Sequence, residues 1–290
     1  MSVFKTTAEL HNREVTISEL TIKDLKIILK SIIYIDSTPF VFFDTLNSVL
    51  AIKTSLSLQE IRNLNIVDYV ILILSIKSIS TSSEVKIAIN DGDTSSSMSI
   101  DISKFIDTLK SIDLNTHIRS STVQGINIQY KIPTIQEIFM QDDDLISSFM
   151  FVESVGIDTN RIVHINQLSR PELLTLRNNL PVKIKKEIDK VANNLYKYFN
   201  TVNLLSVYNT IRKTDLIFNF NKDNMILLFS IIFNENLMVI YQNMFMLCKY
   251  SNLAAEYVES ITPGEYNIFV SLLEAFLSKD DGKDENIRIP

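Results

Sequence analysis

Tryptophan is absent from the 290-residue sequence, and glycine and cysteine are scarce, with five residues and one residue respectively. The scarcity of glycine argues against glycine-rich phosphate-binding loops and indicates a chain built mostly of regular elements. The single cysteine, Cys248, excludes an internal disulfide framework and a zinc site made from several cysteines. Because no signal-peptide pattern is present either, we expect a soluble protein of a reducing cytoplasm.

A strong basic run is also missing, and the net charge is −6 with a pI of about 5.2. Proteins that bind DNA or RNA through their surface usually carry a basic face, so we predict no nucleic-acid partner. Acidic side chains are interleaved with the densest group of lysines, which predicts a solvated helix face rather than a phosphate-binding patch. This group consists of Lys183, Lys185, Lys186 and Lys190, with Glu187 and Asp189 between them.

No apolar run is long enough for a membrane span. The longest, from Met225 to Phe233, is interrupted by Ser230. It is far shorter than the roughly 20 residues that a helix needs to cross a bilayer. We therefore predict no membrane association.

Catalytic motifs are missing as well: the sequence contains no G-x-S-x-G elbow, no H-E-x-x-H pair and no P-loop. Cys248 lies in an apolar helical run and far in sequence from His11, His117 and His164, which indicates a buried structural thiol rather than a nucleophile. We predict no catalytic residue and no cofactor.

Two acidic clusters could hold a metal ion, but each has a simpler interpretation. Asp142, Asp143 and Asp144 precede an apolar stretch and would complement the dipole of a helix N-terminus. The run from Asn90 to Asp93 resembles the opening of a calcium loop, but no glutamate follows at the twelfth position, and turn formation explains it. We predict no metal site at either cluster.

A β-rich insert at residues 84–134 separates two helical regions. Apolar residues alternate with polar ones from Val85 to Ile89, from Met98 to Ile102 and again from Ile126 to Ile132. This period of two is typical of strands with one buried face. The first two runs predict a hairpin with its turn at Asn90–Asp93, and a short helix is expected at about 103–112.

Helical periodicity governs most of the remaining sequence, and capping-box patterns mark several helix starts. The patterns begin at Thr21, Ser57, Ser169 and Thr262. A hairpin is expected at 3–18, a buried central helix at 66–79, a short hairpin at 158–165 and a long helix at 182–212 that is broken near Asn200. The fold class is therefore predominantly helical α+β, with an N-terminal hairpin and helices, the small antiparallel insert, and a C-terminal helical region. We predict a domain of residues 1–140, a second of 141–278, and a flexible tail of 279–290.

One group of methionine and aromatic side chains follows helical spacing near the C-terminal end. Such a stripe is typical of a core helix, and the alternative is an adaptable surface on which a partner docks. The candidate partner-binding residues are Met238, Tyr241, Met244 and Phe245.

Several short motifs follow one another across residues 3–277, namely VTISELTIKD (15–24), NLNIVDY (63–69), YKIPT (130–134), the helix of 173–180 and TPGEY (262–266). They comprise an N-terminal hairpin running into a helix, a leucine, an aspartate and an aromatic residue before an apolar helix, a proline–threonine close of the insert, and the later helix starts. In this order the motifs resemble those of the baseplate hub assembly proteins of T4-type contractile-tailed bacteriophages. Relatives carry a cysteine pair at the tip of the insert, which this chain lacks, so no zinc site follows from the resemblance.

The resemblance implies a non-enzymatic viral structural protein that is a baseplate hub component or a chaperone of hub assembly. Its expected partners are other baseplate hub or tail-initiator proteins, and it would act in the host cytoplasm during assembly or in the virion tail baseplate. Two alternatives stay open from the residues themselves. One is a regulatory module that binds a helix in a groove, and the other is a carboxylate- or metal-dependent enzyme using Asp91 or Asp142–Asp144.

Overall fold

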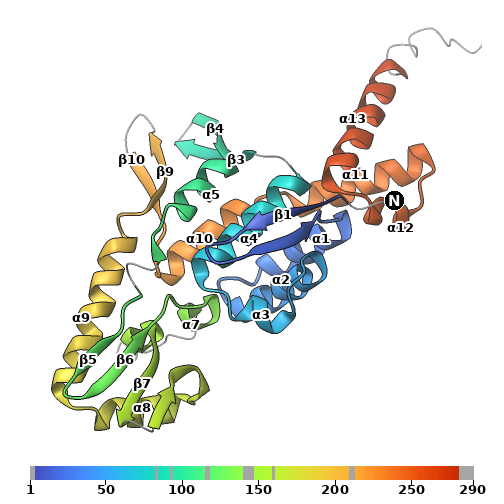
Figure 1. Cartoon of the computed structure of the whole chain (residues 1–290). Helices are drawn as coiled ribbons and strands as arrows, with labels where there is room; N and C mark the ends of the chain where they lie inside the picture. Colours follow the sequence, from blue (N-terminus) through green and yellow to red (C-terminus); the bar gives the residue numbers. More distant parts are fainter. Residues whose placement is uncertain are drawn as a thin grey trace, which may run out of the picture.

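The computed structural model shows a predominantly helical α+β fold, which confirms the predicted class (Figure 1). The described residues are 4–81, 84–91, 94–114, 118–139, 147–158, 161–208 and 213–280. Three predicted features fall outside them: the end of the insert's hairpin turn at Gly92 and Asp93, the acidic cluster Asp142–Asp144, and most of the tail. The backbone of the first two tail residues, 279 and 280, belongs to the last helix.

The described chain begins with the predicted antiparallel hairpin, which leads into four helices, among them those predicted to start after Thr21 and Ser57 and the one predicted at 66–79. Hydroxyls of Thr21 and Ser57 accept hydrogen bonds from the backbone N–H groups of Asp24 and Glu60, and the two carboxylates bond back to the capping residues. These reciprocal bonds satisfy backbone donors that a helix start leaves free. The elements are β1 (Lys5–Glu9), β2 (Glu14–Ser18), α1 (Ile22–Ile32), α2 (Pro39–Lys53), α3 (Leu58–Arg62) and α4 (Ile66–Ser80).

Helix α4 is the central helix that its apolar sequence predicts. Nearly all of its side chains are buried, because apolar residues cover most of its circumference. The Tyr69 hydroxyl donates a hydrogen bond to Asn47 Oδ1 at 2.8 Å, so this polar group is satisfied inside the core. Burial raises the pKa of the Tyr69 hydroxyl, which therefore remains a donor.

The predicted β insert is divided between two separate sheets. Strands β3 (Glu84–Asp91) and β4 (Thr94–Asp101) form the expected hairpin, which is followed by α5 (Ile102–Lys110). The later strands instead form a four-stranded antiparallel sheet in the order β5-β6-β7-β8. Its members are β5 (Ser121–Val123), β6 (Ile126–Tyr130), β7 (Val152–Asp158) and β8 (Arg161–His164), and the last two are the hairpin predicted at 158–165 in longer form.

Local chemistry explains the turn in this sheet but not its strand order. Gln124 and Gly125, between β5 and β6, both have positive φ angles, of 53° and 77°. Two such residues fit a tight turn whose twist matches that of the flanking strands. The pairing of β6 with β7 joins Asn127 to Gly156 across the short helix α7 (Ile135–Phe139) and the 3-10 turn η1 (Ser147–Phe151).

The C-terminal half contains a further hairpin at residues 203–217, where the sequence predicted that the long helix continues after its break near Asn200. Helix α9 (Val182–Phe199) ends well before residue 212, and β9 (Asn203–Tyr208) and β10 (Lys213–Ile217) pair antiparallel after it. The sequence LLSVY (204–208) contains β-branched and aromatic residues, which favour a strand. The helical periodicity of the surrounding sequence does not exclude a strand at this position. The other elements are η2 (Ile165–Gln167), α8 (Arg170–Asn179), α10 (Lys222–Ile232), α11 (Leu237–Ser251), α12 (Ala255–Ser260) and α13 (Pro263–Asp280), of which α12 was not predicted.

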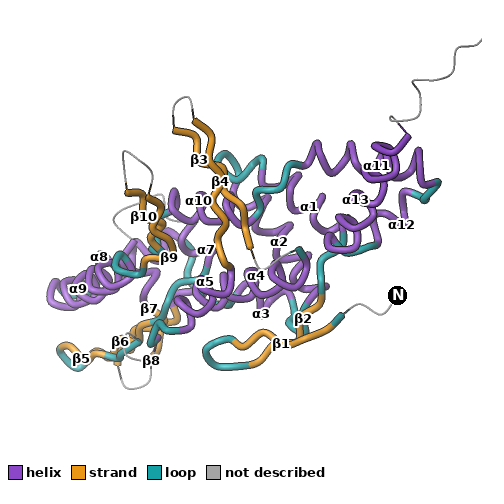
Figure 2. The backbone as a smooth tube through the Cα atoms, turned by 90° about the horizontal axis from the view of Figure 1, so that it is seen from above, coloured by secondary structure: helices purple, strands orange, loops and turns teal. Residues whose placement is uncertain are grey.

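Two buried clusters organise the described part of the chain. The smaller one packs the four-stranded sheet against α9, with Ile128 and Val155 meeting Ile184 and Ile188. The larger one joins the N-terminal helices to α10–α13, so it draws on both predicted domains. Figures 1 and 2 show the sheet with α8 and α9 at one end of the molecule and α11–α13 at the other. The predicted boundary near residue 140 stays a prediction.

Candidate partner-binding surface

Helix α11 carries the methionine and aromatic residues that the sequence singled out. Its start is fixed by Asn236, whose side-chain oxygen accepts hydrogen bonds from the backbone N–H groups of Met238 and Val239 at 2.9 and 3.3 Å. Its end is fixed by Asn252, which adopts a left-handed conformation with φ of 52°. The helix is therefore held at both ends by local chemistry, and its faces point in defined directions.

Three of the four candidate residues lie on the outer side of α11, and the fourth does not. Met238 and Phe245 are each 64% exposed and Tyr241 is 36% exposed, whereas Met244 is only 7% exposed and packs in the larger core cluster. Met244 shares the inward face with Ile240 and Leu247. We call Met238, Tyr241 and Phe245 the α11 stripe, and we assign Met244 to the core.

Helix α13 adds a second exposed stripe, which the sequence analysis missed. Ile268, Leu272 and Phe276 are all exposed and recur every four residues, so they lie along one side of the helix. The opposite side packs inward through Tyr266 and Leu273. The sequence did contain a signal for this stripe: apolar residues recur every four positions on a helix whose opposite side is also apolar. We call these three exposed residues the α13 stripe.

Lysine side chains surround the aromatic part of the α11 stripe. Lys26 and Lys30 of α1 place their Nζ atoms 4.7 and 5.6 Å from the centre of the Tyr241 ring. Lys249 lies 5.9 Å from the Phe245 ring centre. Lys26 is buried and ion-paired with Glu259, whereas Lys30 and Lys249 are exposed. A hydrogen bond with Tyr241 raises the pKa of Lys30, so this side chain stays cationic at neutral pH. The rim of the stripe is therefore positive on a chain whose net charge is negative.

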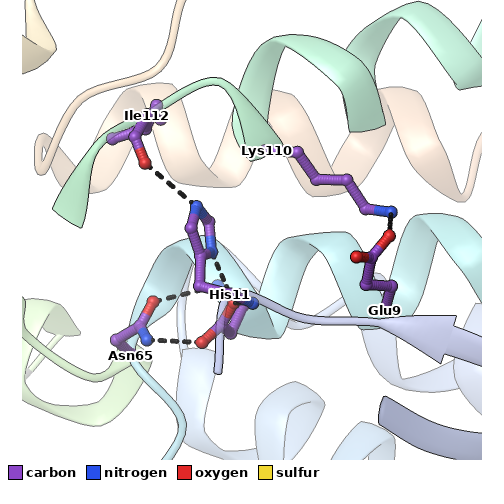
Figure 3. A network of polar contacts seen from close by, with 6 residues as sticks. Glu9, His11, Asn65, Lys110 and Ile112 are labelled. Carbon is purple, nitrogen blue, oxygen red and sulfur yellow. Dashed lines mark hydrogen bonds and ion pairs between the residues drawn. The ribbon is translucent and has the colours of Figure 1, made fainter. Parts of the chain in front are cut away.

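A different polar cluster joins the N-terminal hairpin to the core (Figure 3). His11, in the turn between β1 and β2, places Nδ1 2.7 Å from Asp68 Oδ1 and Nε2 3.1 Å from the carbonyl oxygen of Ile112. Both partners are acceptors, so both ring nitrogens donate and the ring is an imidazolium. Asn65 donates to the other oxygen of Asp68 at 2.7 Å. Every one of these contacts is internal, and the cluster acts as a tether between three segments.

Each member of the His11–Asp68 pair shifts the pKa of the other. The hydrogen bond to Asp68 raises the pKa of His11, against the opposing effect of burial. Burial acts to raise the pKa of Asp68, but hydrogen bonds from His11 and Asn65 outweigh it, so the carboxyl pKa is lowered. The Asp68 contribution to stability is present above the ordinary carboxyl pKa and is lost as the pH falls through the lowered one. The His11 contribution is complete below about pH 6.5 and is lost as the pH rises through the raised pKa.

We therefore expect the free energy of unfolding to fall as the pH rises above about 6.5 in the wild type, and to fall less in His11→Gln. The difference between the two proteins isolates His11, because His164 and all other titrating groups are common to both. Urea unfolding followed by circular dichroism at several pH values measures this. Parallel profiles for the two proteins would show that His11 is not charged in the folded state.

The remaining chemical candidates do not gather into a site in the described part of the chain. Among those residues no group of three or more histidine, cysteine, aspartate or glutamate side chains could hold a metal ion. Cys248 packs against the larger core cluster but is only partly buried, so it is less enclosed than the buried thiol predicted from the sequence. Asp142–Asp144 lie outside the described residues, and so does the side chain of Asp91, so the carboxylate alternative stays a prediction.

One described helical stretch, residues Lys222–Ser251, is long and apolar enough by length and composition to cross a membrane. It consists of two helices, since α10 ends at Ile232 and α11 begins at Leu237. These helices have 11 and 15 residues, and each is shorter than the roughly 20 residues that a span requires. Its apolar character is used instead in packing α10 into the core and in the exposed stripe of α11.

Comparisons with known proteins give no relative from which a function can be taken. No family model matches the chain, no curated protein matches it, and no solved structure matches it.

Proposed function

We propose that this chain is a non-enzymatic protein of a contractile phage tail, a baseplate hub component or a chaperone of hub assembly, that acts by binding other proteins. The order of its sequence motifs supports the phage family. The observation that carries the binding role is the pair of exposed apolar stripes on α11 and α13. A regulatory module that binds a helix of another protein uses the same surface and differs only in its partner.

The α13 stripe supports a binding role because it lies on a helix that is apolar on both sides. Such helices are usually buried completely in soluble proteins. Here the helix projects from the end of the molecule, as Figure 1 shows, and leaves Ile268, Leu272 and Phe276 exposed. Grouped exposed apolar side chains of this kind mark protein–protein contacts. A bound partner would remove these three side chains from solvent.

The α11 stripe and the lysines around it indicate which side chains the partner would carry. Interfaces have apolar and aromatic side chains at the centre and polar groups at the rim. The centre here would be Met238, Tyr241 and Phe245, and the rim contains the exposed cations of Lys30 and Lys249. Opposite charges across a rim accelerate association and select partners. The partner segment is therefore apolar along one side, with acidic residues beside it.

Mass spectrometry of purified virions and of assembly intermediates from the same infection tests the proposed role. We expect the chain at a fixed copy number relative to hub or tail-initiator proteins. Its presence in virions would make it a baseplate component, and its presence only in intermediates would make it a chaperone that leaves on maturation. Absence from both would contradict the phage-tail role and favour the regulatory module.

A further inference from the structure

A surface hollow of about 510 Å³ lies between α9 and the segment that leads into β5. Arg119, Ser120 and Ser121 line it from that segment, and Glu187 and Lys190 line it from α9. Figures 1 and 2 show β5 and α9 at the end of the molecule opposite to α11–α13, so the hollow is separate from the two stripes. Its volume is within the range of about 300–1,000 Å³ that is typical of ligand sites.

Two exposed cations line this hollow from distant parts of the sequence. Within the part of the chain that the structure describes, Arg119 makes no hydrogen bond and no ion pair. Lys190 has one carboxylate nearby, with its Nζ 3.6 Å from Glu187 Oε2, which is longer than a hydrogen bond. Both cationic side chains are therefore available to a ligand.

The sequence alone did not indicate this pairing of cations. Lys190 belongs to the lysine group that was predicted to form a solvated helix face, because acidic residues are interleaved with it. The second cation, Arg119, precedes β5 and is far from α9 in the sequence. The fold places the two side chains around one hollow, which helical spacing could not show.

Donors outnumber acceptors among the polar groups that line the hollow. A guanidinium group has five N–H donors and an ammonium group has three, and neither accepts a hydrogen bond. The exposed Ser120 hydroxyl and Asn194 amide can donate as well. Glu187 is the one acidic side chain in the described lining, and it is half-buried. The hollow therefore favours a ligand that carries acceptor oxygens.

The charge of the lining favours a ligand with a single negative charge. Arg119 and Lys190 are two cations and Glu187 is one anion, so the lining is positive by one charge on a chain whose net charge is −6. A carboxylate matches this charge, whereas a phosphate ester carries about −1.5 to −2 at neutral pH. The planar guanidinium also matches the two oxygens of a carboxylate. A carboxylate is therefore a better fit than a phosphate.

We propose that this hollow binds a carboxylate that is attached to a small apolar group. Arg119 and Lys190 are long and exposed, so both can donate to the carboxylate oxygens, and hydrogen bonds between charged groups are stronger than neutral ones. The half-buried Val191, which also lines the hollow, would contact the apolar group. This site goes beyond the proposed docking role, because none of the stripe residues lines it.

An NMR titration of the full chain with 3-phenylpropionate, and with the neutral 3-phenylpropionamide as matched probe, tests the proposal. The Arg119 Nε–H signal is identified as the one that Arg119→Gln lacks. We expect the carboxylate to move this signal with a Kd on the order of 1 mM or tighter, and the amide to bind at least about tenfold more weakly. No movement of the signal with the carboxylate, or equal affinities for the two probes, would overturn the proposal.

Two variants and two matched controls locate the effect, with affinity measured from the line broadening of the probe's aromatic protons. Arg119→Gln and Lys190→Gln each remove one cation and should each weaken binding by about tenfold or more. Arg161→Gln on β8 and Lys197→Gln on α9 remove cations that do not line the hollow, and should leave the affinity unchanged. All four positions are exposed, so all four variants should fold. Affinity that survives in Arg119→Gln and Lys190→Gln, or that falls equally in the controls, would overturn the proposal.

The carboxylate could belong to a free organic acid or to an acidic side chain beside an apolar one in a protein partner. The peptide N-acetyl-leucyl-glutamyl amide, with its glutaminyl counterpart as control, separates these two sources. Binding of this peptide at least about tenfold tighter than 3-phenylpropionate assigns the site to a partner's side chain, and equal or weaker binding assigns it to an organic acid. The isolated chain is sufficient for these experiments, so their result does not depend on the phage-tail role.

Discussion

Phe229→Ala is expected to lower the free energy of unfolding by about 3–5 kcal/mol, the range for truncating a buried aromatic ring. Phe229 lies on α10 and is fully buried. Its ring centre is 5.7 Å from that of Phe42, 5.2 Å from that of Phe43 and 6.3 Å from that of Tyr69, in edge-to-face arrangements. Each such pair contributes about 0.5–1.5 kcal/mol beyond the burial of area. The substitution removes all three contacts and leaves a cavity.

The position of Phe229 makes the effect informative about the architecture. Its three ring partners belong to α2 and α4, so the ring connects the C-terminal helices to the N-terminal ones. Urea unfolding should show one transition moved to lower urea concentration. Leu227→Ala is the control, since Leu227 is on the same helix but 48% exposed, and about 0.5 kcal/mol or less is expected. A loss below about 1 kcal/mol for Phe229→Ala would mean that α10 does not pack as described.

Helix starts were the most predictable part of the fold because their determinants are local. The capping pairs at Thr21, Ser57, Ser169 and Thr262 all form, each with a carboxylate three residues later. A capping residue and a carboxylate one turn later are enough to satisfy the first backbone donors of a helix. The local sequence is therefore sufficient to predict where these four helices start.

Strand partners were much less predictable, because pairing depends on residues far apart in the chain. The alternation at Ile126–Ile132 correctly indicated a strand, but nothing in it shows that β6 joins β7 rather than the β3–β4 hairpin. The break near Asn200 was predicted and α9 ends at Phe199, but the strand that follows, β9, was missed for a related reason. β9 is stabilised by its pairing with β10, and such tertiary contacts override local propensity.

The candidate surface was likewise predictable only in part. Helical spacing identified the residues of α11, but the packing of that helix against α1, α12 and α13 decided that Met244 faces inward while Met238 faces solvent. The buried ionic contacts could not be predicted at all. His11 and Asp68 are 57 residues apart and Lys77 and Glu235 are 158 residues apart, and neither pair shares a sequence motif.

Charges placed in the α11 stripe are expected to weaken partner binding by about 100-fold or more. Aromatic and long apolar side chains at the centre of an interface commonly contribute about 2 kcal/mol or more each. The double variant Met238→Glu/Phe245→Glu removes two of them and inserts two carboxylates into an apolar contact that the acidic partner segment would cover. Both positions are largely exposed, so the fold itself should tolerate the change.

Ile162→Glu is the matched control for this variant. Ile162 is 61% exposed and lies on β8, in the sheet at the opposite end of the molecule (Figure 2). It introduces the same kind of charge at an equally exposed apolar position. Leu272→Glu extends the test to the α13 stripe, and it should also weaken binding if both helices contact the partner.

The most direct measurement is the dissociation constant for the proposed hub or tail-initiator partner, determined by isothermal titration calorimetry with the wild type, the double variant and the Ile162 control. We predict unchanged affinity for Ile162→Glu and a loss of about 100-fold or more for the double variant, with the Tm values of all three proteins close together. Equal affinities for the wild type and the double variant would contradict the assignment of α11 as the docking surface.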